Sequence, residues 1–129
     1  MNALERAKNA FLTIHYKDSR RKLETWRIYD RNGEVQIYNG ENWRTDYSLT
    51  AAEIQRVQAA LKDCNVLNAE SISAGNVHDA ATLIWEWSLP DGKTGTVTNR
   101  AYPAVKHPAT ECVMSMLLDI EDAYMENPE

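Results

Sequence analysis

The side chains of this chain that could carry catalysis or bind a metal ion are few and far apart. The two cysteines are Cys64 and Cys112, and the three histidines are His15, His78 and His107. A zinc site needs such ligands at short, recurring spacings, and a Cys-His nucleophile pair needs an exposed thiol beside an imidazole. The spacing here matches neither pattern, so we expect no catalytic residues and no metal site.

Motifs that bind nucleotides or other cofactors are also missing from the sequence. It contains no GxGxxG, GxxxxGK[ST], HExxH or GxSxG, and the chemistry of those sites depends on these spacings. We therefore expect no cofactor and no enzyme activity. The alternative is an enzyme or a small-ligand binder whose site is assembled from scattered residues, and the candidates for it are His78, Asp79, Glu86 and Arg100. A deep pocket that joins these groups would support that alternative.

The two cysteines are expected to be packing residues. Cys64 and Cys112 lie in or beside segments with the apolar periodicity of helices, where a free thiol behaves as a small apolar side chain. A disulfide between them requires Cα atoms within roughly 7 Å of each other. We expect free, buried thiols.

Aromatic side chains near polar turns are the unusual feature of this sequence. The chain has four tryptophans and six tyrosines, and most of them are expected to fill the core of a small sheet. Trp43, flanked by Asn42 and Arg44 after a glycine turn, fits a core least well. Exposed Trp, Tyr and Arg side chains anchor many protein interfaces. We therefore predict that Trp43, Arg44 and Tyr47 form a contact patch for another protein.

The charge is modest and unevenly distributed. The net charge is −5, which argues against nucleic acid as a partner because phosphate binding needs clustered Lys and Arg. Residues 1–62 hold eleven basic and eight acidic side chains, about +3, whereas residues 63–129 hold three and eleven, about −8. Such asymmetry can orient a protein partner. A weaker idea is that the acidic C-terminal segment imitates the charge of nucleic acid.

Length and hydropathy place the chain among single-domain proteins. A chain of 129 residues is typical of one domain, here residues 1–129, and is long enough to bury a core without a metal or disulfide. Its N-terminus does not resemble a secretory signal, and no apolar stretch approaches the ~20 residues of a membrane helix. We therefore expect a cytoplasmic protein with no membrane contact.

The N-terminal half alternates strand-like segments with turns. Residues 2–9 favour a short helix and residues 11–16 a strand, with one helix through both as the alternative. Residues 23–29 and 35–38 form a predicted hairpin around Asn32-Gly33, a pair that supplies the positive φ angles of a tight turn. Residues 42–48 can add a short strand.

The clearest helix signal begins at Leu49. Thr50 and Glu53 form a capping box, and Leu49 and Ile54 have the spacing of a hydrophobic staple. Apolar side chains then recur at helical spacing as far as Leu61, so one face of this helix is apolar. The helix is predicted to end near residue 63.

The C-terminal half predicts a second hairpin and a second helix. Residues 82–89 and 94–98 favour strands joined by a turn at residues 90–92, and residues 108–125 carry a continuous apolar stripe at helical spacing. Hairpins linked to helices imply that the helices cover one side of the sheet. We therefore predict an α+β fold, an antiparallel sheet of two hairpins with two amphipathic helices packed on one face.

Residues 23–124 also match the layout of a known group of domains. The matching pieces are Ile28-Tyr29, Gly33, Val35, Tyr38, Leu49-Thr50 with Glu53, Asp79, the hairpin at residues 85–97, and Tyr102-Pro103. This layout resembles small bacterial domains of unknown function and, more distantly, the emfourin type of protein inhibitor of thermolysin-like metallopeptidases. The first 22 residues and the tryptophan content depart from it. The resemblance implies the α+β layout and a non-catalytic binding role, and no inhibitory residue is matched.

These observations favour a small non-catalytic protein-binding module, such as an inhibitor or an accessory or immunity-type factor. The expected partner is another protein. A homodimer formed through the tryptophan-containing strands or a sheet edge is a further option.

Overall fold

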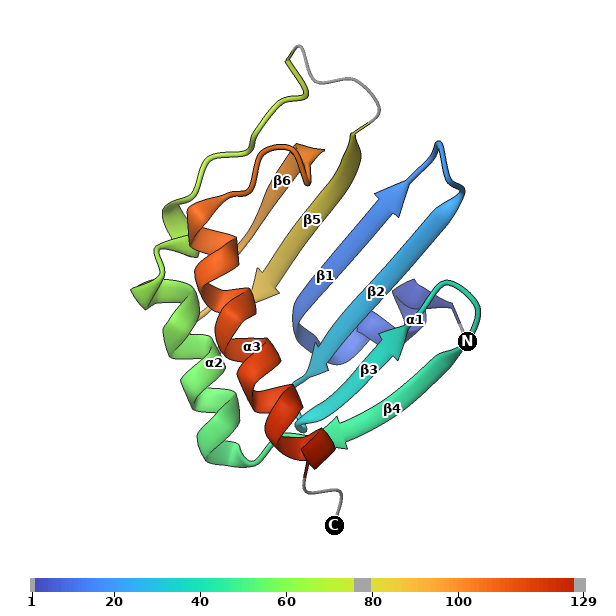
Figure 1. Cartoon of the computed structure of the whole chain (residues 1–129). Helices are drawn as coiled ribbons and strands as arrows, with labels where there is room; N and C mark the ends of the chain where they lie inside the picture. The colour runs from blue at the N-terminus through green and yellow to red at the C-terminus, as the bar shows by residue number, and fades with distance from the viewer. Residues whose placement is uncertain (1, 76–79, 127–129) are drawn as a thin grey trace.

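A computed structural model describes residues 2–75 and 80–126, so His78 and Asp79 lie outside the described residues. Within this part, a six-stranded antiparallel sheet carries two long helices on one face (Figure 1). The predicted α+β class is therefore confirmed.

The sheet is larger than two hairpins because the first strand joins it at the centre. Its strands are β1 (Ala10–Asp18), β2 (Leu23–Asp30), β3 (Glu34–Tyr38), β4 (Trp43–Ser48), β5 (Ala81–Ser88) and β6 (Thr94–Tyr102), and their order is β4-β3-β2-β1-β5-β6. The strand β1 pairs with β2 on one side and with β5 on the other. It thereby connects the two predicted hairpins into one sheet.

The two long helices cover the core side of the sheet. They are α2 (Ala51–Asp63) and α3 (Pro108–Glu126), and they run side by side in Figure 1. The apolar stripe of α3 is buried at Val113, Leu117 and Ile120. It packs in one core cluster with Trp85 and Trp87 of β5. Alternation along β5 is what directs both indoles toward the helices.

The start of α2 matches the sequence signal in detail. The Glu53 amide donates to the Thr50 hydroxyl at 3.2 Å, and the Thr50 amide donates to the Glu53 carboxylate at 2.9 Å. The Tyr124 hydroxyl of α3 donates to the same carboxylate. The capping box therefore also fastens the C-terminal end of α3 to the first turn of α2.

The turn between β2 and β3 differs slightly from the prediction. Only Gly33 of the Asn32-Gly33 pair has a positive φ, at +100°. A Cβ on Gly33 would clash with the Leu49 carbonyl oxygen, and the Leu49 amide donates to the Gly33 carbonyl at 2.8 Å. Gly33 is therefore needed both for the turn and for the close approach of the chain that enters α2.

The prediction that the cysteines are free is wrong. Cys64 and Cys112 form a disulfide with a Cα–Cα distance of 5.8 Å. Cys64 is the residue that caps the end of α2, and Cys112 lies in the first part of α3. The two helices are neighbours only in the folded chain, so the spacing of the cysteines in the sequence carried no sign of this contact.

A partly buried ion pair joins the sheet to α3. The Arg27 guanidinium of β2 donates to both carboxylate oxygens of Glu121, at 2.9 and 3.1 Å, and to the Tyr29 hydroxyl at 3.2 Å. Burial by itself would lower the pKa of Arg27, but these contacts with Glu121 and Tyr29 raise it above its ordinary value. Such a bidentate pair fixes geometry as well as charge.

Loss of the disulfide is expected to destabilise the protein. The bridge closes a loop between residues 48 positions apart, so opening it should lower the free energy of unfolding by about 4 kcal/mol. Urea unfolding with and without a reductant measures this. The C64A/C112A variant serves as control, because its unfolding midpoint should not respond to reductant. Equal midpoints for the oxidised and reduced parent protein would contradict the bridge.

Breaking the Arg27–Glu121 pair on one side should cost more than removing both charges. Arg27→Met or Glu121→Leu leaves a largely buried charge without its partner, and each is expected to lower stability by about 3 kcal/mol. The R27M/E121L double variant should lose clearly less than the sum of the two. Chemical denaturation of the parent, the two single variants and the double variant gives the four free energies of unfolding of a double-mutant cycle. If the losses of the single variants simply add up to that of the double variant, the two side chains do not interact.

Candidate functional site

The face of the sheet opposite α2 and α3 carries an aligned row of aromatic side chains. The strand register pairs His15 with Trp26, Trp26 with Tyr38, and Tyr38 with Trp43. These four residues come from four neighbouring strands at one level of the sheet. Since residues paired across antiparallel strands project to the same face, they form one row, named here the aromatic row.

Ring contacts hold the aromatic row in place. The rings of His15 and Trp26 stack with centroids 3.8 Å apart and an angle of 11°, and those of Tyr38 and Trp43 lie 5.2 Å apart. Nε2 of His15 lies 2.7 Å from a carboxylate oxygen of Glu24. All four rings are half-buried, so one part of each is fixed and another part is accessible.

The N-terminal segment crosses the same face beside the aromatic row. It consists of the helix α1 (Ala3–Arg6) and a 3-10 turn at Ala7–Asn9, and Figure 1 shows it behind the sheet as seen from the helix side. The Arg6 guanidinium lies 4.6 Å from the Trp43 ring centroid and donates to the Gln36 side chain at 2.7 Å. Ile28 of β2, on this same face, is completely buried, and the 3-10 turn of the N-terminal segment contacts β2.

Two shallow hollows flank the aromatic row, and Trp26 lines both of them. One hollow, of about 310 Å³, includes Leu4, Arg31 and Glu86, and the other, of about 210 Å³, includes Glu24. The Leu4 side chain is 80 % exposed. The surface therefore combines apolar anchors with charges of both signs, which is the composition of a contact surface more than of a reaction site.

The structure does not bring the predicted patch of Trp43, Arg44 and Tyr47 onto one surface. Trp43 belongs to the aromatic row, whereas Arg44 is exposed on the edge strand and pairs with Asp46 at 2.6 Å. Tyr47 is only 8 % exposed and stacks on Tyr124 of α3 with centroids 4.8 Å apart. Its burial also raises its pKa. An irregularity in the pairing of β3 with β4 separates Tyr47 from the alternation expected in a regular strand.

The described members of the alternative, scattered site do not converge. Glu86 faces its β6 partner Thr96, and Arg100 lies four residues farther along β6, which places them roughly 13 Å apart along the strand. His107 lies elsewhere, with Nε2 3.0 Å from the Glu70 carbonyl oxygen. The described residues contain no group of three His, Cys, Asp or Glu side chains that could hold a metal ion.

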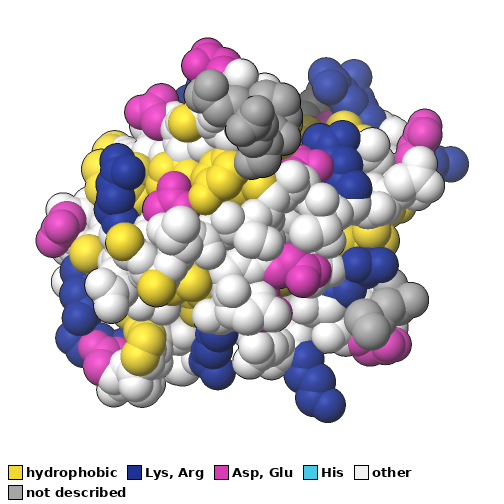
Figure 2. Space-filling model, turned by 90° about the horizontal axis from the view of Figure 1, so that it is seen from below, with side chains coloured by type: hydrophobic (Ala, Val, Ile, Leu, Met, Phe, Trp, Pro, Cys, Tyr) yellow, Lys and Arg dark blue, Asp and Glu magenta, His cyan; other side chains and the backbone are white. Residues whose placement is uncertain are grey.

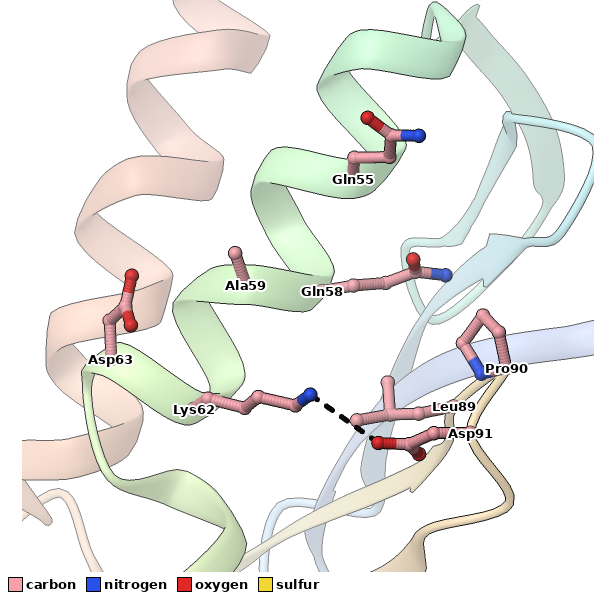
Figure 3. A pocket seen from close by; sticks show the side chains of 8 residues that line it. All are labelled: Gln55, Gln58, Ala59, Lys62, Asp63, Leu89, Pro90 and Asp91. Atoms are coloured by element: carbon pink, nitrogen blue, oxygen red, sulfur yellow. Dashed lines mark ion pairs between the residues drawn. The ribbon is translucent and has the colours of Figure 1, made fainter.

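A groove between α2 and the β5–β6 turn is the next surface feature (Figure 3). It measures about 330 Å³ and is lined partly by Gln58 and Pro90. Lys62 reaches across it to Asp91, with the charged atoms 3.3 Å apart. An exposed ion pair of this kind contributes little energy, and it bridges the two walls of the groove. We assign no ligand to it.

The two edges of the sheet are protected differently. Along β6, the Ile72 amide donates to the Thr98 carbonyl at 2.8 Å and the Arg100 amide donates to the Ile72 carbonyl at 2.9 Å. The β4 edge has instead an irregular pairing and the charged Arg44, which are common devices against edge-to-edge association. The open sheet face is therefore a better candidate for binding than either edge.

Charges of both signs are interspersed on the lower end of the molecule. Figure 2 shows Lys and Arg side chains alternating with Asp and Glu side chains there, and apolar side chains gathered in small groups between them. That end is therefore a mixed polar surface and does not present a uniform field to a partner.

Comparisons of the chain with models of known protein families and with curated protein sequences find no match. The resemblance to emfourin-type inhibitors therefore stays a prediction. Among the helices of residues 2–75 and 80–126, none is long and apolar enough to cross a membrane.

Sequence reasoning found Trp43 but missed the other three members of the aromatic row. Alternation within one strand predicts that Trp26 and Tyr29 project to different faces of the sheet. The same rule puts Tyr38 on the face away from Ile37. It could not align residues from different strands, because register depends on turns and tertiary packing. In the sequence His15 is an isolated histidine, whereas in the fold it stacks on Trp26.

Tryptophan fluorescence should separate the two faces of the sheet. Trp85 and Trp87 are 1 % and 7 % exposed, whereas Trp26 and Trp43 are half-buried. The W26F/W43F variant should therefore emit at shorter wavelength and resist quenching by acrylamide. The W85F/W87F variant is the matched comparison and should keep most of the quenchable emission. The opposite pattern would mean that the faces are assigned the wrong way round.

Proposed function

We propose that the protein is a non-catalytic binding module that docks another protein on the open face of its sheet. The observation that carries this proposal is the aromatic row, in which His15, Trp26, Tyr38 and Trp43 align across four strands on the face away from the long helices. Aromatic side chains held by their neighbours lose little conformational freedom on binding and dominate contact energies.

The shape of this face favours a protein over a small molecule. The hollows on either side of the row are shallow and share one wall, Trp26, whereas small-molecule sites usually enclose most of their ligand. Charged groups on this face, such as Arg6, Glu24 and Glu86, are placed to form a polar rim. An inhibitory, accessory or immunity-type role would use the surface in this way.

The charge of this face argues against nucleic acid as the partner. Glu24 is in contact with the aromatic row and Glu86 lines the neighbouring hollow. Stacking of bases on aromatic rings is normally accompanied by Lys and Arg that track the phosphates. With a net charge of −5, the chain lacks that general attraction.

A second copy of the chain is the competing occupant of the open face. The indoles of Trp85 and Trp87 are buried beneath the helices, so a dimer through these two side chains would require the core to open. A homodimer would therefore use the aromatic row itself. Such a homodimer would have twice the mass of the chain in solution, and substitutions in the aromatic row would return it to the mass of a monomer.

The disulfide bears on the location of the protein. A cytoplasmic location stays a prediction, and the Cys64–Cys112 bridge weighs against it because reducing compartments keep most thiols free. We propose that the protein works in an oxidising compartment. A bridge that closes α2 against α3 would be maintained there.

Site-specific crosslinking in the native host tests the docking surface. A photoreactive amino acid at Thr45, an exposed position on the open face paired with Gln36, should give a defined adduct with a partner protein. The same group at the exposed Asp119 of α3 is the matched control and should not. Adducts from position 119 alone would refute the surface, and an adduct of twice the chain mass would make the partner a second copy.

Substitution of an anchor should then weaken the adduct. Trp43→Ala on the edge strand is expected to reduce crosslinking from position 45 roughly tenfold or more, as for a central interface aromatic. Leu118→Ala is the control, since Leu118 is an apolar side chain of α3 that is 39 % exposed. Equal loss in both variants would point to general destabilisation, which the thermal midpoints would reveal. No loss with Trp43→Ala would remove the aromatic row from the proposal.

A further inference from the structure

A second, unassigned cleft lies on the helix side of the sheet, and it is independent of the proposed docking face. It occupies about 200 Å³ between α3 and the neighbouring ends of β1, β2, β5 and β6. Three aromatic side chains line it, Tyr16, Trp85 and Tyr102, together with the thioether of Met114. The aromatic row is on the opposite face, so a ligand in this cleft would not contact it.

Two tyrosines form a corner at the cleft. The rings of Tyr16 and Tyr102 meet edge-on, with centroids 6.0 Å apart and an angle of 80°. Burial raises the pKa of both phenols, so they remain neutral at physiological pH. A right-angled pair of electron-rich rings offers a π face and a polar tip to the same ligand.

The wall contributed by Trp85 contains an unsatisfied donor. This side chain is 1 % exposed, and its indole Nε1 has no acceptor among the described residues. Buried donors almost always find an acceptor. This nitrogen is itself shielded from solvent, so the cleft meets Trp85 through the indole ring and not through its N–H.

The cleft has one carboxylate whose charge is not balanced by a neighbouring cation. Arg27 is neutralised by its bidentate contact with Glu121. Glu111, in the first turn of α3, lines the cleft. Its backbone amide donates to the His107 carbonyl at 3.0 Å, whereas its carboxylate has no hydrogen-bond or ion-pair partner among the described residues. Its charge contributes, after burial, to the raised pKa of Tyr102, which means that it acts on the aromatic corner. The cleft is therefore net negative.

We propose that this cleft binds a methylated ammonium group, with the cation held between the Tyr16–Tyr102 corner and the Glu111 carboxylate. Aromatic faces attract organic cations, and the attraction grows when water is excluded. Methyl groups suit the apolar part of the lining, which could not replace the hydration of a bare ammonium. The volume exceeds one such headgroup, so the cleft has room for a short chain attached to it.

Two sources of this chemistry can be distinguished by titration. Choline represents a free small molecule, and Nα-acetyl-trimethyllysine amide represents a modified protein side chain. Each is titrated into the protein, and binding is followed by amide chemical shifts around Glu111 and Tyr102. The source that binds more tightly is the better match. The neutral isostere of choline, 3,3-dimethylbutan-1-ol, isolates the contribution of charge.

The expected result on the unmodified protein is saturable binding of at least one cation, about tenfold tighter than the neutral isostere. Equal binding of choline and its isostere would overturn the proposal, because the cleft would then be recognising only apolar shape. Failure of both cations to saturate the shifts up to about 50 mM, an affinity too weak to matter, would also overturn it. This titration uses the unmodified protein, so its outcome does not depend on whether a variant folds correctly.

Variants assign the cation to its contacts. Glu111→Gln keeps the shape of the side chain and is expected to weaken cation binding about tenfold through loss of the nearby charge. Asp119→Asn, an exposed acidic position on the same helix, removes an equal charge away from the cleft and should change little. Tyr102→Phe keeps the ring and should retain binding, whereas Tyr102→Leu should lose it. Equal effects of the Glu111 and Asp119 variants would contradict a specific contact.

Discussion

The register of β1 is the constraint on which the rest of the structure depends. This strand pairs with β2 and with β5 at once, so it aligns Ile14 with both Arg27 and Trp85, and His15 with both Trp26 and Ile84. Side chains alternate between the two faces of a sheet, and a slip of one residue would exchange them. The pairing register of β1 therefore determines that Trp85 and Trp87 lie in the core and that Trp26 lies on the open face.

This arrangement places the links that stabilise the fold on the face opposite the proposed docking surface. The disulfide, the capping box with Tyr124 and the Arg27–Glu121 pair all lie on the helix side, where they fix α3 against α2 and the sheet. The open face holds none of these links and, within residues 2–75 and 80–126, is crossed by the short N-terminal segment. A surface with a rigid support behind it can present anchors without reorganising, which lowers the entropy lost on binding.

Local signals in the sequence predicted the helices and both hairpins, because capping, turn residues and periodicity act over a few positions. The capping box at Thr50 and the stripe ending at Tyr124 are of this kind. The central place of β1, the Cys64–Cys112 contact and the aromatic row depend instead on which distant segments become neighbours. The sequence also suggested that Tyr47 is exposed, since an irregular strand pairing cannot be seen from alternation.

The part of the open face formed by β5 and β6 can be compared with the part that carries the aromatic row. On β5 and β6 the same face carries Ile84 paired with Thr98, and Glu86 paired with Thr96. Threonine is what a half-exposed strand needs for folding alone, because its branched side chain suits the pleat and its hydroxyl tolerates water. The same level of the sheet carries Trp26 and its aromatic neighbours on β1 to β4. Strand formation does not demand rings there. Part of their role is internal, because the Arg6 guanidinium of the N-terminal segment lies over the Trp43 ring, and the accessible remainder of the row is what supports the proposed docking surface.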